Sequence, residues 1–279
     1  MPRIGPSVKR PPAACVIFFA DGLSQAVLKR MLAADELPNI NRLFARGGVE
    51  VENAIVCLPS LTYANAVSLI TGLFPGHHGI LGNQWFDPTT LEYRDYGGPL
   101  TYRRVNDDIK HATIYDLLDD HFTLNVQCHT RKGVKHTIDQ DISSGILWGL
   151  GMHQTVDRRV GDVLPRIARV IERDGRWPIV WMNYFPGVDE IGHRFGPDSQ
   201  EYAAAVRNVD AQVGRIAAFA QENAGVERLF LSFVTDHGMV ASPSDDRGDL
   251  RLEESVRSIV SKMRVIRPAR CLPAIIGEP

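Results

Sequence analysis

The chain has 279 residues, of which 44% are hydrophobic and 23% charged, and its net charge is −2. This length suits one large α/β domain or two smaller ones, and the composition is that of a globular protein. The small net charge argues against a broad basic face, so we expect no nucleic-acid polymer as a partner. No apolar run approaches the length of a membrane span, and the eight-residue run at 13–20 ends in Asp21-Gly22, as a buried strand does, rather than as a signal-peptide core. We therefore expect no membrane partner and a cytoplasmic location.

The first part of the chain predicts a buried strand followed by short helices. Residues 1–12 form a basic, proline-rich lead-in. Ser24 is a candidate cap for the first helix, and Gly72 is positioned to end another. In chain order we expect a strand at 14–20, a helix from Ser24 to Leu32, a helix at 38–46, a β-like segment at 49–56, a turn at 59–62, a helix at 63–71 and an extended loop region at 75–110.

The rest of the chain alternates between helical and strand-like patterns. In chain order we expect a helix at 111–119, a strand at 123–128, helical spacing at 156–173, a strand at 179–184, a helix at 199–222, a strand at 227–235 and a helix at 252–263. Such alternation predicts an α/β fold with a doubly wound, mostly parallel central sheet and helices on both faces. We assign residues 13–240 to this core and 241–279 to a shortened C-terminal segment.

Three predicted strands end in side chains that bind metals. Asp21 follows the first strand, Asp189 and His193 follow the strand at 179–184, and Asp236 and His237 follow the strand at 227–235. The carboxyl ends of parallel strands usually hold the functional residues of open α/β sheets. Each aspartate alone is more often a helix cap, but the joint pattern predicts a shared site. Carboxylate and imidazole ligands suit zinc, and also manganese or iron.

Thr62 is the candidate nucleophile, because it lies at the predicted start of a helix. The helix dipole and the free N–H groups at this end favour an anion. From its local context alone a simple N-cap is the better interpretation, and Ser60 is a competing hydroxyl. The four cysteines, Cys15, Cys57, Cys128 and Cys271, form no closely spaced pair and indicate neither a cysteine zinc site nor a disulfide framework.

Taken together, these motifs resemble the alkaline phosphatase superfamily, and within it the nucleotide pyrophosphatase/phosphodiesterase (type I phosphodiesterase) branch. The similarity covers roughly residues 14–240, and the combination of motifs is more specific than any one of them. The matching segments are Asp21-Gly22, 59–65 (PSLTYAN), 71–75 (TGLFP), 78–80 (HGI), Gly82-Asn83, Asp87-Pro88, 189–193 (DEIGH), 196–199 (GPDS) and 236–239 (DHGM).

The resemblance implies a role for each matching residue. Asp21, Asp236 and His237 would bind one zinc ion together with the Thr62 oxygen, and Asp189 and His193 would bind a second. Thr62 would attack phosphorus and form a phosphothreonine, which water would then hydrolyse. Asn83 would donate to a non-bridging phosphate oxygen, whereas His78 would be structural. Two divalent ions can stabilise the attacking and leaving oxygens together.

The sequence departs from the family pattern after His237. The family's second zinc normally takes a further histidine, downstream of a capping insertion. Here no histidine follows His237, and 279 − 237 leaves 42 residues. We therefore expect the cap and the C-terminal part to be missing and the second site to be incomplete, unless His129, His136 or His153 substitutes.

We therefore expect a metal-dependent phosphoryl-transfer hydrolase that cleaves phosphodiester or nucleotide pyrophosphate bonds in a small phosphate-ester substrate. A phosphonoacetate hydrolase or a phosphomonoesterase with the same core is an alternative, and so is a degenerate binding protein without activity. No Cys-x-Pro-x-Arg motif supports a sulfatase. Aromatic residues in the 75–110 region could stack on a flat leaving group or simply pack the loop. The sequence leaves the oligomeric state open.

Overall fold

The computed structural model describes residues 2–52, 54–98, 101–139 and 142–241. The helix expected at 252–263 therefore lies outside the described residues. The chain divides into two compact units, Met1–Met239 and Val240–Pro279, and the fold described below is that of the first. Among the described residues, no helix combines the length and the apolar character needed to cross a membrane.

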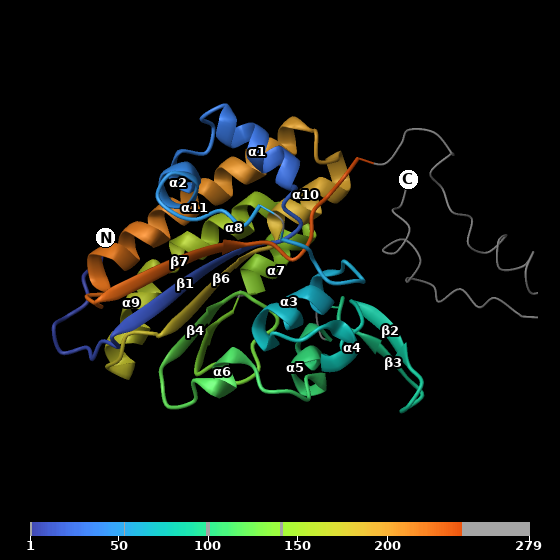
Figure 1. Cartoon of the computed structure of the whole chain (residues 1–279), viewed down its shortest axis with the longest axis horizontal. Coiled ribbons are helices and arrows are strands. Elements are labelled where there is room, and N and C mark those ends of the chain that lie inside the picture. The colour runs from blue at the N-terminus through green and yellow to red at the C-terminus, as the bar shows by residue number, and fades with distance from the viewer. Residues whose placement is uncertain (1, 53, 99–100, 140–141, 242–279) are drawn as a thin grey trace, which may run out of the picture. The chain divides into compact units, whose positions relative to one another are not determined.

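A sheet of five parallel strands forms the centre of this unit (Figure 1). This confirms the predicted parallel α/β architecture. The sequence pattern predicts four of the strands, whereas the fifth, β5, has only three residues and is too short to show a period. In spatial order the strands are β5 (His136–Ile138), β4 (Thr123–Val126), β6 (Val180–Phe185), β1 (Ala13–Ala20) and β7 (Arg228–Val234).

Helices cover both faces of the sheet, and each face has its own hydrophobic core (Figure 1). Side chains alternate along a strand, so Val16 and Phe18 of β1 enter one core and Phe19 enters the other. The first core is closed by α1 (Gln25–Ala33), α8 (His153–Asp162), α9 (Leu164–Asp174) and α11 (Gln200–Asn223). The second is closed by α3 (Thr62–Thr71), α5 (Val105–Asp108) and α6 (Ile114–Leu117).

Shorter elements connect these layers. The hairpin β2–β3 is antiparallel and lies outside the main sheet. The remaining elements are α2 (Pro38–Ile40), the π-helical turn η1 (Asn41–Ala45), α4 (Pro75–His78), β2 (Gln84–Asp87), β3 (Glu92–Asp95), the 3₁₀ turn η2 (Tyr102–Arg104), α7 (Ile142–Gly149) and α10 (Gly187–Phe195).

Two sequence expectations are wrong, and a third is borne out with a break. The described part of 49–56 contains no strand, and Val49 and Ile55 are 93% and 92% exposed; a β-prone sequence forms a strand only where another strand pairs with it. The 75–110 region holds a hairpin and short helices rather than one loop. The segment 156–173 is two helices, because Pro165 suits the first turn of a helix but not an interior.

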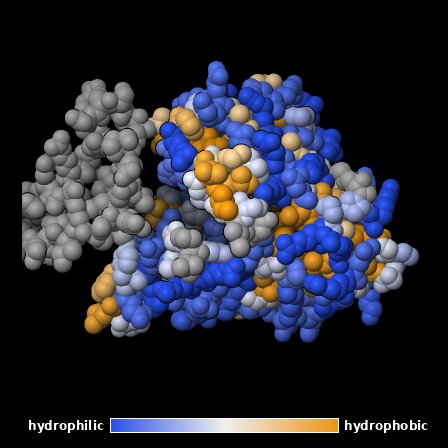
Figure 2. Space-filling model, turned by 180° about the vertical axis from the view of Figure 1, so that it is seen from behind, coloured by the Kyte–Doolittle hydropathy of each residue, from blue (hydrophilic) through white to orange (hydrophobic). Residues whose placement is uncertain are grey.

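The face of the molecule seen in Figure 2 is mostly hydrophilic. Hydrophobic side chains gather on it in separate patches between charged and polar ones. The most exposed large apolar residues of the described chain include Val49, Ile55 and Leu58. They precede the start of α3 and lie outside both cores.

Candidate functional site

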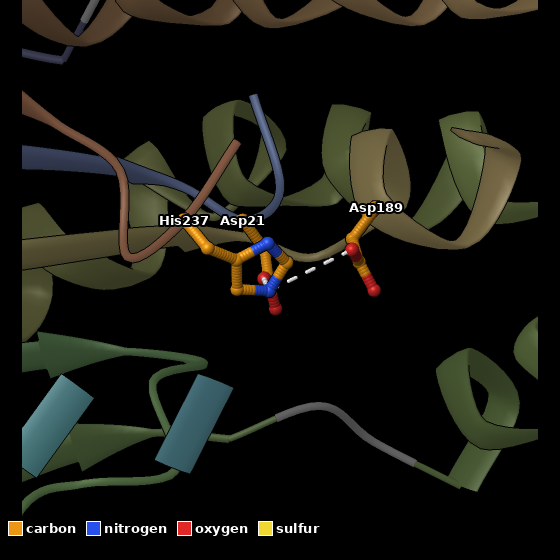
Figure 3. A group of neighbouring side chains, drawn as sticks. All are labelled: Asp21, Asp189 and His237. Carbon is orange, nitrogen blue, oxygen red and sulfur yellow. Dashed lines mark ion pairs between the residues drawn. The ribbon is translucent and has the colours of Figure 1, made fainter. Parts of the chain in front are cut away.

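The carboxyl ends of three neighbouring strands bring the predicted metal ligands together. β6, β1 and β7 are adjacent and parallel, so their ends share one edge of the sheet. Asp21 directly follows β1, and Asp236 and His237 follow β7. Asp189 lies in the first turn of α10, which begins two residues after β6 ends. Figure 3 shows Asp21, Asp189 and His237 pointing toward one another.

His237 lies at the centre of this cluster. Its Nε2 atom is 3.5 Å from Asp21 Oδ1, 3.5 Å from Asp236 Oδ2 and 3.8 Å from Asp189 Oδ1. Ligand atoms of Asp21, Asp189 and His237 all lie within 4.8 Å of one another, close enough to share one ion. The structure thus turns Asp189 Oδ1 toward the group expected to hold the first ion.

The donor atoms of this cluster fit a divalent cation. Asp21 Oδ1, Asp189 Oδ1 and Asp236 Oδ2 are buried and accept no hydrogen bond from any residue that the structure describes. Isolated buried carboxylates are strongly unfavourable unless paired or bound to a metal. His237 Nδ1 lies 3.0 Å from the Gly238 carbonyl oxygen. Since a carbonyl only accepts, Nδ1 carries the proton, and the lone pair of Nε2 faces the carboxylates, as metal ligation requires.

The backbone at Gly22 leaves room for this cluster. Gly22 has φ +62°, and a Cβ atom there would lie 2.8 Å from Asp189 Cβ. Its amide donates to Asp236 Oδ1 at 3.2 Å. Any side chain at this position would therefore occupy the space between the carboxylates.

Burial and mutual repulsion raise the pKa values of the three carboxyl groups. Desolvation is the main cause for all of them. It raises the pKa of Asp21 well above its usual range, with a further rise from the charge of Asp236. It also raises the pKa of Asp189 and brings that of Asp236 to about 6. A bound cation would reverse these shifts by favouring the ionised forms.

Two tyrosines that the sequence analysis missed hold the cluster in place. Tyr184 of β6 donates its hydroxyl to Asp21 Oδ2, which leaves Oδ1 directed at His237. Tyr202 of α11 donates to the Gly22 carbonyl at 2.8 Å and accepts from the Ser24 amide at 2.8 Å. Only the strand order, which pairs β6 with β1, places Tyr184 beside Asp21.

Thr62 is the first residue of α3, and its Oγ1 lies 3.4 Å from His237 Nε2. It does not act as the N-cap, since Leu61 occupies that position and no side chain caps the helix. Its hydroxyl therefore faces the acidic cluster with the helix amino end behind it. The competing hydroxyl, Ser60, is exposed and lies two residues before the helix.

Asn83 and His78 both contact α3. Asn83 Oδ1 accepts from the Tyr63 amide at 3.1 Å, so its side chain lies at the same helix end as Thr62. Its Nδ2 group donates to none of the residues that the structure describes. His78 is buried, and its ring nitrogens lie within hydrogen-bonding distance of the Ile80 amide and the Ala64 carbonyl. These contacts are those of a residue that supports α3.

His193 lies one turn after Asp189 on α10, with its Nε2 3.5 Å from Asp189 Oδ2 and its side chain 63% exposed. The three histidines considered as substitutes do not join this pair. His129 packs between Tyr63 and Tyr184, and burial lowers its pKa to about 4. His136 begins β5, which β4 separates from β6. His153 lies 3.9 Å from Glu190.

An open parallel sheet with a buried Asp/His cluster and a helix-start hydroxyl at its carboxyl edge defines an alkaline phosphatase-like α/β protein. The family model described as type I phosphodiesterase / nucleotide pyrophosphatase matches residues 15–268. The chain belongs to this family.

The chain is also similar to curated members of the family. It is 28% identical over 220 residues to an uncharacterized pyrophosphatase/phosphodiesterase of Schizosaccharomyces pombe, covering 75% of this chain and 42% of the relative. It is 26% identical to human ectonucleotide pyrophosphatase/phosphodiesterase family member 5, covering 69% and 39%. A bis(5'-adenosyl)-triphosphatase of Xenopus laevis is 26% identical, with 76% and 44% covered. The chain thus spans about two fifths of the length of these relatives.

Proposed function

We propose that the chain is a metal-dependent phosphoryl-transfer hydrolase that cleaves phosphodiester or nucleotide pyrophosphate bonds through a phosphothreonine at Thr62. The proposal rests on one observation above all. Thr62 Oγ1 lies 3.4 Å from an imidazole nitrogen that is itself within 3.8 Å of three buried carboxylate oxygens. A hydroxyl becomes a good nucleophile only when a base or a metal lowers its pKa, and this arrangement offers such a metal site.

The donor set divides into two groups for two divalent ions, for which zinc is our first choice. Asp21, Asp236 and His237, with the Thr62 oxygen, would hold one ion, and Asp189 and His193 would contribute to the other. When bound, the ions would supply Lewis-acid stabilisation of the attacking and leaving oxygens. Zinc takes both carboxylate and imidazole ligands, which fits both groups.

The chain's own residues account for the remaining steps. Thr62 Oγ gives its proton to solvent water as it attacks phosphorus, and the bond to the leaving-group oxygen breaks as that oxygen gains a proton from water. Water then attacks the phosphothreonine, the Thr62 O–P bond breaks and Thr62 recovers its proton. The amino end of α3 stabilises the negative charge beside Thr62. Asn83 Nδ2, whose partner oxygen is fixed by the Tyr63 amide, donates to a non-bridging phosphate oxygen.

The test is turnover of a small substrate panel by the full chain with added zinc or manganese. The panel contains bis-p-nitrophenyl phosphate, thymidine p-nitrophenyl monophosphate, p-nitrophenyl phosphate and phosphonoacetate. Diadenosine triphosphate is added because one relative is named as a bis(5'-adenosyl)-triphosphatase. We expect turnover of the diesters and the dinucleotide. Preference for the monoester or the phosphonate would move the assignment to those alternatives.

Thr62→Ala should abolish turnover and leave the fold intact. Thr71→Ala is the matched control, because Thr71 ends the same helix and, among the described residues, its hydroxyl bonds only within that helix and its terminus. Equal activity in Thr62→Ala and the wild type would remove Thr62 as nucleophile. A metal-loaded wild type that turns over nothing in the panel would favour a binding protein without activity.

A further inference from the structure

The helix that carries Asp189 and His193 is held at its start by a buried acid from another helix. Asp157 of α8 accepts a hydrogen bond from the Gly187 amide at 3.0 Å. Gly187 is the first residue of α10, and Asp157 is completely buried. The first amides of a helix have no partner within the helix, so an acceptor from outside fixes its end.

The chain supplies no local cap for α10. The N-cap position is Pro186, whose side chain has no acceptor. Asp157, which precedes Gly187 by 30 residues, therefore does what an N-cap side chain does in most helices.

Gly187 lets the two helices approach closely at this point. A Cβ atom at residue 187 would lie 2.8 Å from Asp157 Cγ and 2.9 Å from the His153 carbonyl oxygen. Both of these neighbours belong to α8 and neither can swing into solvent, because Asp157 and His153 are buried. The start of α10 thus rests directly on α8.

We propose that Asp157 is a positioning residue for the metal centre, acting through α10 on Asp189 and His193. Asp189 is the third residue of the helix and His193 lies one turn further, so rotation or displacement of the helix start moves both donor atoms. The idea rests on the metal assignment made in the proposed function. It adds a residue whose side chain bonds to the backbone of α10 rather than to a metal ligand.

The experiment measures zinc affinity of the full chain by competition with a chromophoric chelator. The zinc-binding step that Asp189→Asn weakens is first taken as the step that depends on α10. Asp157→Ala should weaken the zinc affinity of that same step by about 10- to 100-fold, which is the usual effect of losing a residue that orients a ligand. Asp157→Asn keeps the acceptor oxygen, so its zinc affinity should stay within about threefold of the wild type. Combining Asp157→Ala with Asp189→Asn should weaken the step by less than the two separate effects together, because both act through α10.

Gly187→Ala tests the same contact from the other helix and should also weaken this step. If circular dichroism shows that Asp157→Ala does not fold, Gly187→Ala serves as the test instead. Asp162→Ala is the matched control, since Asp162 ends α8 with a side chain 57% exposed and, of the residues that the structure describes, pairs only with Arg215. It should bind zinc as the wild type does.

The proposal is overturned if Asp157→Ala or Gly187→Ala is folded and binds zinc like Asp162→Ala. It is equally overturned if Asp157→Asn loses as much affinity as Asp157→Ala, since charge rather than the acceptor would then matter. If Asp189→Asn itself leaves zinc binding unchanged, the metal assignment of the proposed function fails first. If the wild type is active but the Asp157 variants bind zinc unchanged, only this inference fails and the proposed function stands.

Discussion

Individual residues at the carboxyl edge of the sheet are confined to a small space by their neighbours. Gly22 has a positive φ and faces Asp189, and Tyr184 fixes one oxygen of Asp21. Neither residue is itself a proposed ligand. The geometry of the cluster therefore depends on groups that only orient the donors, and such groups typically change metal affinity when altered.

Gly22→Ala should abolish zinc binding and turnover. The new methyl group would lie 2.8 Å from Asp189 Cβ, in a backbone conformation that disfavours side chains. Gly72→Ala is the control, because Gly72 also has a positive φ, +69°, but has no neighbour within 4 Å of the added atom. Both variants should lose about 1 kcal/mol or more of stability from backbone strain, and calorimetric zinc titration should separate them. Retained zinc binding in Gly22→Ala would contradict the assigned cluster.

Tyr184→Phe should weaken zinc binding by about 10- to 100-fold while leaving the fold intact. The variant loses the hydrogen bond to Asp21 Oδ2, so the carboxylate is free to rotate. Tyr115→Phe is the control, since Tyr115 is completely buried and its hydroxyl has no hydrogen-bond partner among the described residues. Chelator competition measures both. Equal affinities in the two variants would show that Tyr184 does not orient Asp21.

At the scale of elements, the site depends on how helices begin. α3 presents the Thr62 hydroxyl at its first residue without a side-chain cap, and α10 begins against Asp157 of α8. A helix start provides free amides and a favourable potential for anions. The start of α3 therefore faces the charge that develops beside Thr62, and the start of α10 rests on a buried acceptor oxygen of Asp157.

Asp157→Asn should flatten the pH dependence of stability. Burial raises the pKa of Asp157 to about 8, far above its value in an unfolded chain. The stability from this group is fully present below about pH 4, where both states are protonated, and is lost as pH rises towards 8, by about 1.4 kcal/mol per unit at most. The free energy of unfolding of the variant should therefore rise relative to that of the wild type between pH 5 and 7.5, as measured by urea unfolding with chelator present. Parallel curves for the two proteins would contradict this.

At the scale of the whole molecule, three separate stretches of chain meet at one sheet edge. The strands β6, β1 and β7 are far apart in sequence, and their order in the sheet alone makes them neighbours. An ion bound by Asp21, Asp236 and His237 would therefore connect parts of the chain more than 200 residues apart. A ligand that binds only the folded state stabilises the whole fold.

Chelation should lower the melting temperature of the protein, and zinc should restore it. Saturation at about 100 times the dissociation constant contributes about 2.7 kcal/mol, which for a fold of this size corresponds to about 5 to 10 °C. The Asp236→Asn variant should show little or no change in melting temperature on adding zinc, because it lacks a buried carboxylate oxygen that is directed at His237 and would bind the ion. Differential scanning calorimetry with and without zinc measures the effect. An identical melting temperature for chelated and zinc-treated wild type would argue against a metal centre in the fold.

The sequence by itself determined the class of the fold and the membership of the candidate site. Apolar runs that end in Asp or Asp-His are local features, and the alternation of strands and helices leaves few arrangements for them. Prediction from the sequence failed where the structure of a segment depends on partners far away in the chain. The β-prone residues at 49–56 found no strand to pair with, and β5 is too short to show a period.

Only the tertiary structure decided how the site residues are held and shared. Asp189 Oδ1 turns toward His237 rather than only toward His193, Tyr184 orients Asp21, and Asp157 supports α10. Each of these contacts joins residues that lie on different elements, at separations that sequence periodicity cannot show. The sequence therefore determined which groups are available, and the strand order and helix packing decided which of them meet, because non-local contacts follow from the fold and not from local pattern.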